Sequence, residues 1–111
     1  MIKHVLLWQF KDELSAEEKK DIRESAKYQL TKLVGVVPGL VDMKVEIEPL
    51  ETSNADVYME ATCVDQSALK VYAVHPEHVK VKDMMVENAK VRLCMDYEVS
   101  DWNAENMFRD K

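Results

Sequence analysis

Four stretches of the chain alternate apolar and polar residues with a period of two, and this pattern constrains the fold more than any other feature. The stretches cover residues 2–10, 41–47, 57–63 and 91–99. Successive side chains of a strand point to opposite faces of a sheet, so each stretch predicts a strand. A chain of 111 residues has room for these strands in a single domain.

A helix is predicted between the first two strands. Ser15 and Glu18 have the spacing of a capping box, so we expect the helix to begin directly after Ser15. Gly35 is placed to end it. We expect the charged side chains Lys19, Lys20, Arg23, Glu24 and Lys27 to point outward. The apolar stripe of this helix is Ile22, Ala26, Leu30 and Leu33.

A second helical region is predicted between the last two strands. Asp65 or Ser67 is suited to cap its start. Pro76 interrupts it, because a proline disfavours the helical conformation at the preceding residue, and Pro76 itself suits the first turn of a new helix. The resulting order β-α-β-β-α-β predicts an α+β fold of the ferredoxin-like type, an antiparallel four-stranded sheet with the helices on one face.

The other face of this sheet also needs a cover. Val5, Leu7, Tyr58 and Val64, or their neighbours of opposite parity, place apolar side chains there, and none of the strands has a purely charged second face. A second copy of the same sheet is the simplest cover. We therefore expect a homodimer that forms through the sheet face.

The composition excludes several functions. The 15 Lys and Arg residues against 21 Asp and Glu residues give a net charge of −6. No basic run is present, so we expect no nucleic-acid partner. The only two glycines, Gly35 and Gly39, cannot supply a dinucleotide fingerprint or a phosphate loop. We expect no cofactor.

The sequence also bears on location and redox state. No apolar stretch approaches the ~18 residues of a membrane span, and residues 1–4 lack the apolar core of a signal peptide, so we expect a cytoplasmic protein with no membrane contact. Cys63 and Cys94 lie within alternating runs and predict two small buried hydrophobic residues with reduced thiols. No Cys-x-x-Cys motif supports a zinc site.

One short segment concentrates the side chains that are suited to chemistry. Tyr72, His75 and His78 lie within seven residues, and two of the three histidines of the chain are here. A histidine exchanges a proton near neutral pH, and a tyrosine hydroxyl donates a hydrogen bond to a developing oxyanion. His4 shares a strand face with Trp8. If that face meets the helices, both reach a cavity beside Tyr72 and His78.

Each of these residues also has a structural interpretation. His75 is placed to cap or end a helix, His78 to bond a loop carbonyl, and Tyr72 to pack in the core. A metal site built from the histidines needs a carboxylate such as Glu77 or Asp96, and the spacing is not that of the His-Glu-x-x-His motif. We therefore expect no metal.

At four motifs the sequence resembles the stress-responsive dimeric α/β-barrel (Dabb) family. The motifs are residues 4–12, 37–39, 72–78 and 96–98, and the likeness extends over residues 1–99, followed by a C-terminal tail of residues 100–111. The resemblance implies a ferredoxin-like subunit and a homodimer whose two sheets close into a barrel. It does not imply one activity, since many relatives have none established.

One branch of the family resembles olivetolic acid cyclase, a polyketide cyclase that needs no cofactor. That likeness implies His78 as the base of an aldol cyclisation, with Tyr72 and His4 holding the substrate oxygens. That branch also uses a tyrosine on its first long helix, for which the nearest candidate is Tyr28. Around the helix axis, Tyr28 lies about 160° from the middle of the apolar stripe, so we expect its side chain to face solvent.

Three hypotheses of function follow. The first is a barrel protein that binds a small apolar, partly oxygenated molecule at a site that includes His4, Trp8 and His75. The second is a cofactor-independent enzyme, polyketide-cyclase-like or a related lyase or monooxygenase type, with His78 as general base and Tyr72 as oxyanion donor. The third is a structural or protective protein in which replacing Tyr72 and His78 has no effect.

Overall fold

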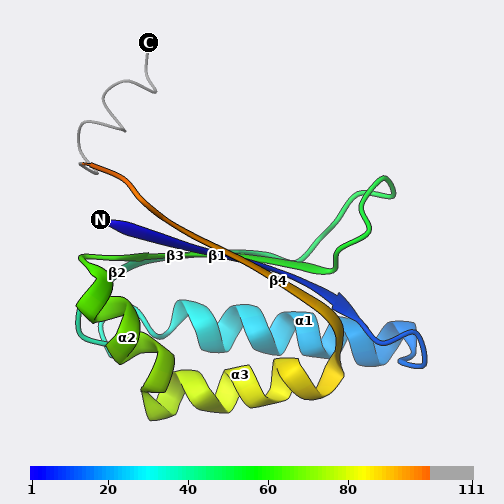
Figure 1. Ribbon diagram of the computed structural model, residues 1–111. Coiled ribbons are helices and arrows are strands. Elements are labelled where there is room, and N and C mark those ends of the chain that lie inside the picture. The colour runs from blue at the N-terminus through cyan, green and yellow to red at the C-terminus, as the bar shows by residue number, and fades with distance from the viewer. Residues whose placement is uncertain (101–111) are drawn as a thin grey trace.

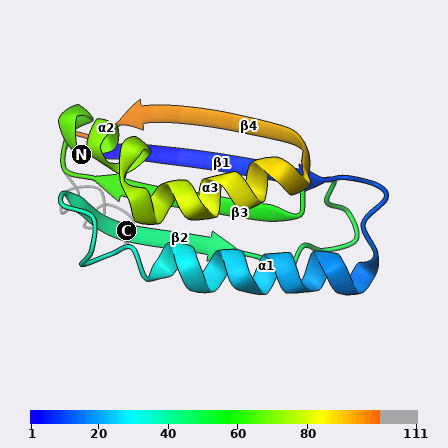
Figure 2. The same cartoon turned by 90° about the horizontal axis from the view of Figure 1, so that it is seen from below.

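The computed structural model describes residues 1–100, so the predicted tail lies outside the described residues except for Ser100. One four-stranded antiparallel sheet has the strand order β2-β3-β1-β4, and all three helices cover the same face (Figures 1 and 2). The elements are β1 (Ile2–Phe10), α1 (Ala16–Thr31), β2 (Leu40–Glu46), β3 (Val57–Cys63), α2 (Gln66–Val74), α3 (Pro76–Asn88) and β4 (Ala89–Glu98). The predicted α+β ferredoxin-like fold is confirmed.

The ends of the helices follow the local sequence signals. The side chains and backbones of Ser15 and Glu18 form both hydrogen bonds of the capping box at the start of α1. Asp65, rather than Ser67, caps α2 by accepting from the Ala68 amide at 2.8 Å. His75 has an extended backbone (ψ 130°) that separates α2 from α3. No helix within residues 1–100 is long and apolar enough to cross a membrane.

The core lies between the sheet and the helices. On β1, Leu6, Trp8 and Phe10 are buried toward the helices, as the alternation predicts. The predicted stripe of α1 meets them, with Ala26 and Leu30 almost fully buried. Burial of these side chains supplies the main stabilising free energy of the subunit.

A bulge at the start of β2 shifts the alternation that the sequence predicts for residues 41–47. The register between β2 and β3 shifts between Leu40 and Asp42. As a result Leu40 is buried, whereas Val41 is 43% exposed. An extra residue in one strand reverses the side-chain parity on its far side, which a strict period of two does not anticipate.

Arg23 also departs from the prediction of an outward charge. Its guanidinium donates to Asp56 at 2.6 Å, and the other carboxylate oxygen of Asp56 accepts from the Phe10 amide at 2.8 Å. Both side chains of this ion pair are mostly buried. The pair therefore links α1 to the end of β1.

Strand β4 turns its apolar residues away from the helices. Leu93 pairs in register with Leu7, which lies on the face of β1 opposite to Trp8. Leu93 is 61% exposed and Met95 is 66% exposed. We call the helix-free side of the sheet the open face, and it is apolar along β4.

The two cysteines differ in environment. Cys63 is buried as predicted, but Cys94 is exposed, so the prediction of two buried cysteines is wrong for Cys94. Cys94 pairs with Leu6 and therefore shares the helix-covered side of the sheet. It remains exposed because β4 is the edge strand and lies beyond the helices (Figure 2).

Candidate functional site

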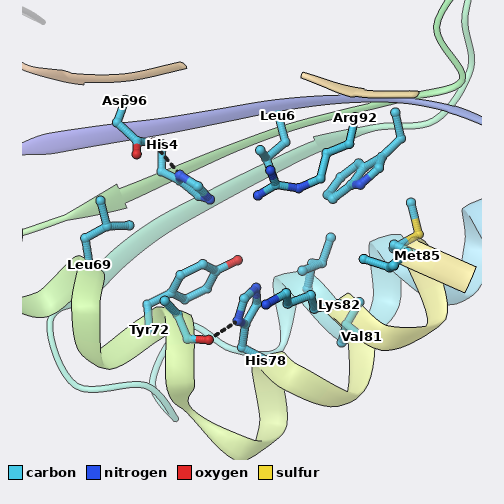
Figure 3. Close-up of a pocket in the computed structure, with 14 residues that line it drawn as sticks. His4, Leu6, Leu69, Tyr72, His78, Val81, Lys82, Met85, Arg92 and Asp96 are labelled. Carbon is cyan, nitrogen blue, oxygen red and sulfur yellow. Dashed lines mark hydrogen bonds and ion pairs between the residues drawn. The ribbon is translucent and has the colours of Figure 1, made fainter. Parts of the chain in front are cut away.

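A pocket opens between the sheet and the helices α2 and α3. Its volume is about 170 Å³. Strands β1 and β4 form one wall, and the two helices form the opposite wall (Figure 3). The polar residues of the lining are His4, Tyr72, His78, Lys82, Arg92 and Asp96, and the apolar ones include Leu6, Trp8, Leu69, Val81 and Met85.

His4 enters the pocket from β1 and is fixed by Asp96. The two residues face each other across β1 and β4, and the His4 Nδ1 is hydrogen-bonded to the Asp96 carboxylate. A carboxylate accepts but does not donate, so Nδ1 carries the proton. The other ring nitrogen, Nε2, is left for a second partner.

Tyr72 lies on α2 and is only 1% exposed. Its ring meets that of His4 edge-on, with the centroids 5.8 Å apart. Its hydroxyl donates to the Met59 sulfur at 3.5 Å, and a thioether is a weak acceptor. Burial raises the pKa of Tyr72. The hydroxyl therefore stays protonated and remains a donor.

His78 lies in the first turn of α3, directly against Tyr72. Their ring centroids are 4.0 Å apart. The Ala73 carbonyl lies 3.3 Å from Nδ1 of His78 and can only accept, so this nitrogen carries the proton and Nε2 is a free acceptor. Burial lowers the pKa of His78, and the nearby His4 and Lys82 lower it further. A neutral imidazole with a free Nε2 is suited to act as a base.

The lowered pKa makes stability depend on pH. As pH falls below about 6.5, the unfolded chain takes up a proton at His78 before the folded protein does, so the free energy of unfolding falls. The effect operates between this value and the lower pKa of the folded state, with a slope of at most ~1.4 kcal/mol per pH unit. We expect denaturant unfolding of the wild type to lose more stability between pH 7 and pH 5.5 than that of His78→Gln. Equal losses would contradict a buried neutral His78.

Trp8 is the second predicted ligand-binding residue that lines the pocket. It is 4% exposed, and among residues 1–100 its buried indole Nε1 has no hydrogen-bond partner. A buried N–H without an acceptor is costly. This donor is therefore free to bond an acceptor atom of a bound molecule.

Two other residues that the sequence suggested lie elsewhere. His75, which the sequence suggested as a ligand-binding residue, is not part of the lining of this pocket. It caps α3, where its Nδ1 accepts from the Glu77 amide at 3.2 Å, and this matches its structural interpretation. Tyr28 is 66% exposed on α1, as its position on the helix predicts, with the Lys32 ammonium over its ring.

The sequence alone did not single out Arg92 or Lys82. Lys82 follows His78 by four residues, which places both on one face of α3. Arg92 pairs with Trp8 across β1 and β4. The spacing of four between His78 and Lys82 becomes informative only once α3 is known to be a helix. The sequence of residues 79–87 does not reveal this helix, because its apolar residues follow no clear helical period. The pairing of β4 with β1 depends on the tertiary fold.

One group of possible metal ligands borders the pocket. The ligand atoms of His4, Cys94 and Asp96 lie within 4.8 Å of one another. His4 and Asp96 already bond each other, and burial and the Asp96 charge raise the pKa of the Cys94 thiol. The Cys94 thiol also contacts Asp96, at 3.5 Å, so hydrogen bonds within the group hold its three residues together.

Solved structures of the same fold come from several organisms. A dimeric ferredoxin-like protein of unknown function from Bacteroides fragilis is 26% identical, with a TM-score of 0.84 over 88% of this chain and 95% of that one. A Dabb family protein from Mesorhizobium loti is 23% identical (TM-score 0.68, 90% and 97% covered). Hydroxynitrile lyase from Passiflora edulis is 11% identical (TM-score 0.69, 90% and 94% covered). The last two likenesses show the fold alone.

No curated protein sequence matches this one. The family model of the stress responsive A/B barrel domain matches residues 2–99, which includes every strand and helix described above and all the residues of the pocket. The chain belongs to the stress responsive A/B barrel domain (Dabb) family.

Proposed function

We propose that this protein is a homodimer whose subunits each bind a small, partly oxygenated organic molecule in the pocket between sheet and helices. The observation that carries this function is the unpaired Nε1 donor of Trp8, a residue of the pocket lining. A cavity of about 170 Å³ is close in size to engineered cavities that take up benzene, so we expect a ligand of one ring.

The open face supports the homodimer. Leu7, Val91 and Tyr97 are each more than a third exposed there, in addition to Leu93 and Met95. A contiguous exposed apolar surface of this kind is typical of an interaction site. The relative from Bacteroides fragilis is described as dimeric, and pairing two such faces is a two-fold arrangement.

Calorimetric titration with benzamide, benzoate, phenol and acetophenone tests the pocket. We expect at least one of them to bind the wild type and none to bind Ala73→Trp, because Ala73 lines the pocket and an indole side chain there would occupy much of a volume of about 170 Å³. An unchanged melting temperature checks that Ala73→Trp is folded. Binding to neither protein, with the dimer intact, rejects the proposed function in favour of a structural or protective role.

A second candidate function, a cofactor-independent acid–base enzyme, is favoured by the contact between Tyr72 and the neutral His78. In such a reaction His78 Nε2 removes a proton from a carbon next to a carbonyl, and the electron pair moves to the carbonyl oxygen. The Tyr72 hydroxyl exchanges its weak bond to Met59 for a bond to that oxyanion. The Passiflora edulis lyase has the same fold, but its low identity transfers no activity.

Deuterium exchange at the methyl group of acetophenone in D₂O tests this second function. We expect exchange above the buffer rate that His78→Gln reduces by at least ~100-fold, the usual contribution of a positioned general base. Tyr72→Phe is expected to reduce it as well. His75→Asn is the control, since it replaces a histidine outside the pocket and retains a capping acceptor. Exchange at the buffer rate with the wild type, or exchange by His78→Gln at the wild-type rate, rejects the proposed enzymatic function.

A further inference from the structure

Two cations of the pocket lining form no ion pair within the part of the chain that the structure describes. Arg92 lies on β4 and Lys82 on α3, and no ion pair or hydrogen bond joins either to another residue of the described chain. Asp96, the acidic residue of the pocket lining, is hydrogen-bonded to His4, and the two cations outnumber its single negative charge. In a protein with a net charge of −6, the pocket is thus a local site of positive charge.

The two cations point into the same space. Figure 3 shows the Arg92 side chain reaching from the sheet, and the Lys82 side chain reaching from α3, toward the space between the two walls. Their charges also act on the residues there, since Arg92 opposes the rise in the pKa of Tyr72 and Lys82 contributes to the lowered pKa of His78.

Trp8 adds a third donor beside Arg92. The two residues are direct partners across β1 and β4, and such pairs bring their Cβ atoms within about 5.5 Å. The unpaired Nε1–H of Trp8 and the N–H groups of Arg92 can only donate. An acceptor that serves both at once has two oxygens and a negative charge, which describes a carboxylate.

We propose that the natural ligand of the pocket is a single-ring organic acid whose carboxylate binds Arg92, Lys82 and the indole N–H of Trp8. The inference rests on the proposed function and specifies the ligand class for that same pocket. Leu6 and Met85 of the lining provide an apolar surface for the ring. The pocket residues His4 and His78 each leave Nε2 as an acceptor, for a hydroxyl or an acidic C–H of the ligand.

Calorimetry with benzoate and its neutral isostere benzamide tests the inference. We expect the wild type to bind benzoate at least ~10-fold more tightly, as a charge-assisted hydrogen bond predicts. Arg92→Gln and Lys82→Gln should each reduce this preference, because each removes a positive charge and therefore weakens the binding of benzoate more than that of neutral benzamide. Lys80→Gln is the control, because Lys80 lies on the same helix but pairs with Glu77 and does not line the pocket.

Each outcome is decisive. Equal affinities for benzoate and benzamide, or an unchanged preference in both glutamine variants, overturn the carboxylate and leave the pocket function standing. Tighter binding of phenyl phosphate than of benzoate also overturns it, in favour of a phosphate ligand. Binding of none of these ligands overturns the proposed function and this inference together.

Discussion

Replacing Gly39 by alanine will lower the free energy of unfolding by about 2–5 kcal/mol, the sum of a left-handed backbone cost and a steric one. Gly39 has φ +82°, and a Cβ at this position would lie 2.5 Å from the Ala68 Cβ. Neither atom belongs to a flexible side chain, so the loop before β2 and the helix α2 must separate. Denaturant unfolding at fixed protein concentration measures the loss.

Two variants separate the contributions at Gly39. Gly35 has φ +90°, but a Cβ added there would meet no atom within 4 Å beyond its chain neighbours, so Gly35→Ala has only the backbone cost, about 1–2 kcal/mol. The double variant Gly39→Ala/Ala68→Gly removes the clash and should recover part of the lost stability. If Gly39→Ala lowers the free energy of unfolding no more than Gly35→Ala does, the close approach of α2 to this loop is contradicted. This approach helps to position Tyr72.

We expect the double variant Leu93→Asp/Met95→Asp to dissociate the proposed dimer. Burying one leucine contributes about 1.5–3 kcal/mol, and two-fold symmetry doubles every substitution, so we expect the dimer dissociation constant to rise at least ~100-fold. Both side chains are more than half exposed in the subunit, so its core is left unchanged. Analytical ultracentrifugation over a range of concentrations measures the shift.

Val74→Asp is the matched control for the open face. Val74 is 75% exposed at the end of α2, on the helix side of the sheet. The variant introduces a similar charge without touching the open face, and we expect it to sediment like the wild type. A Leu93→Asp/Met95→Asp variant that remains as dimeric as Val74→Asp would show that the open face is not the interface.

The local signals of the sequence predicted the fold well because they are short-range. The capping box at Ser15, the break at His75 and the alternation of β1 each depend on a few neighbouring residues. The predicted alternation of residues 41–47 fails at Val41, because a bulge reverses the side-chain parity within the strand. The exposure of Cys94 depends on which strand lies at the edge of the sheet, and that is a property of the whole fold.

The candidate site was only half predictable. Tyr72 and His78 were found because their chemistry and their proximity in sequence are visible in the chain. Arg92 was missed because it resembles any polar residue of an alternating strand, and its place beside Trp8 follows from the pairing of the first and last strands. His75 shares the residue type of His78, but its extended backbone directs it to the cap of α3 instead.

A crystal structure of the protein grown with benzoate tests the central claim most directly, since it locates the ligand relative to the sheet. We expect two subunits paired through their open faces. We also expect benzoate in each pocket between sheet and helices, in contact with Tyr72 and His78 and with its carboxylate on Arg92. Benzoate bound between the two sheets, or only at the surface with both pockets empty, would contradict it.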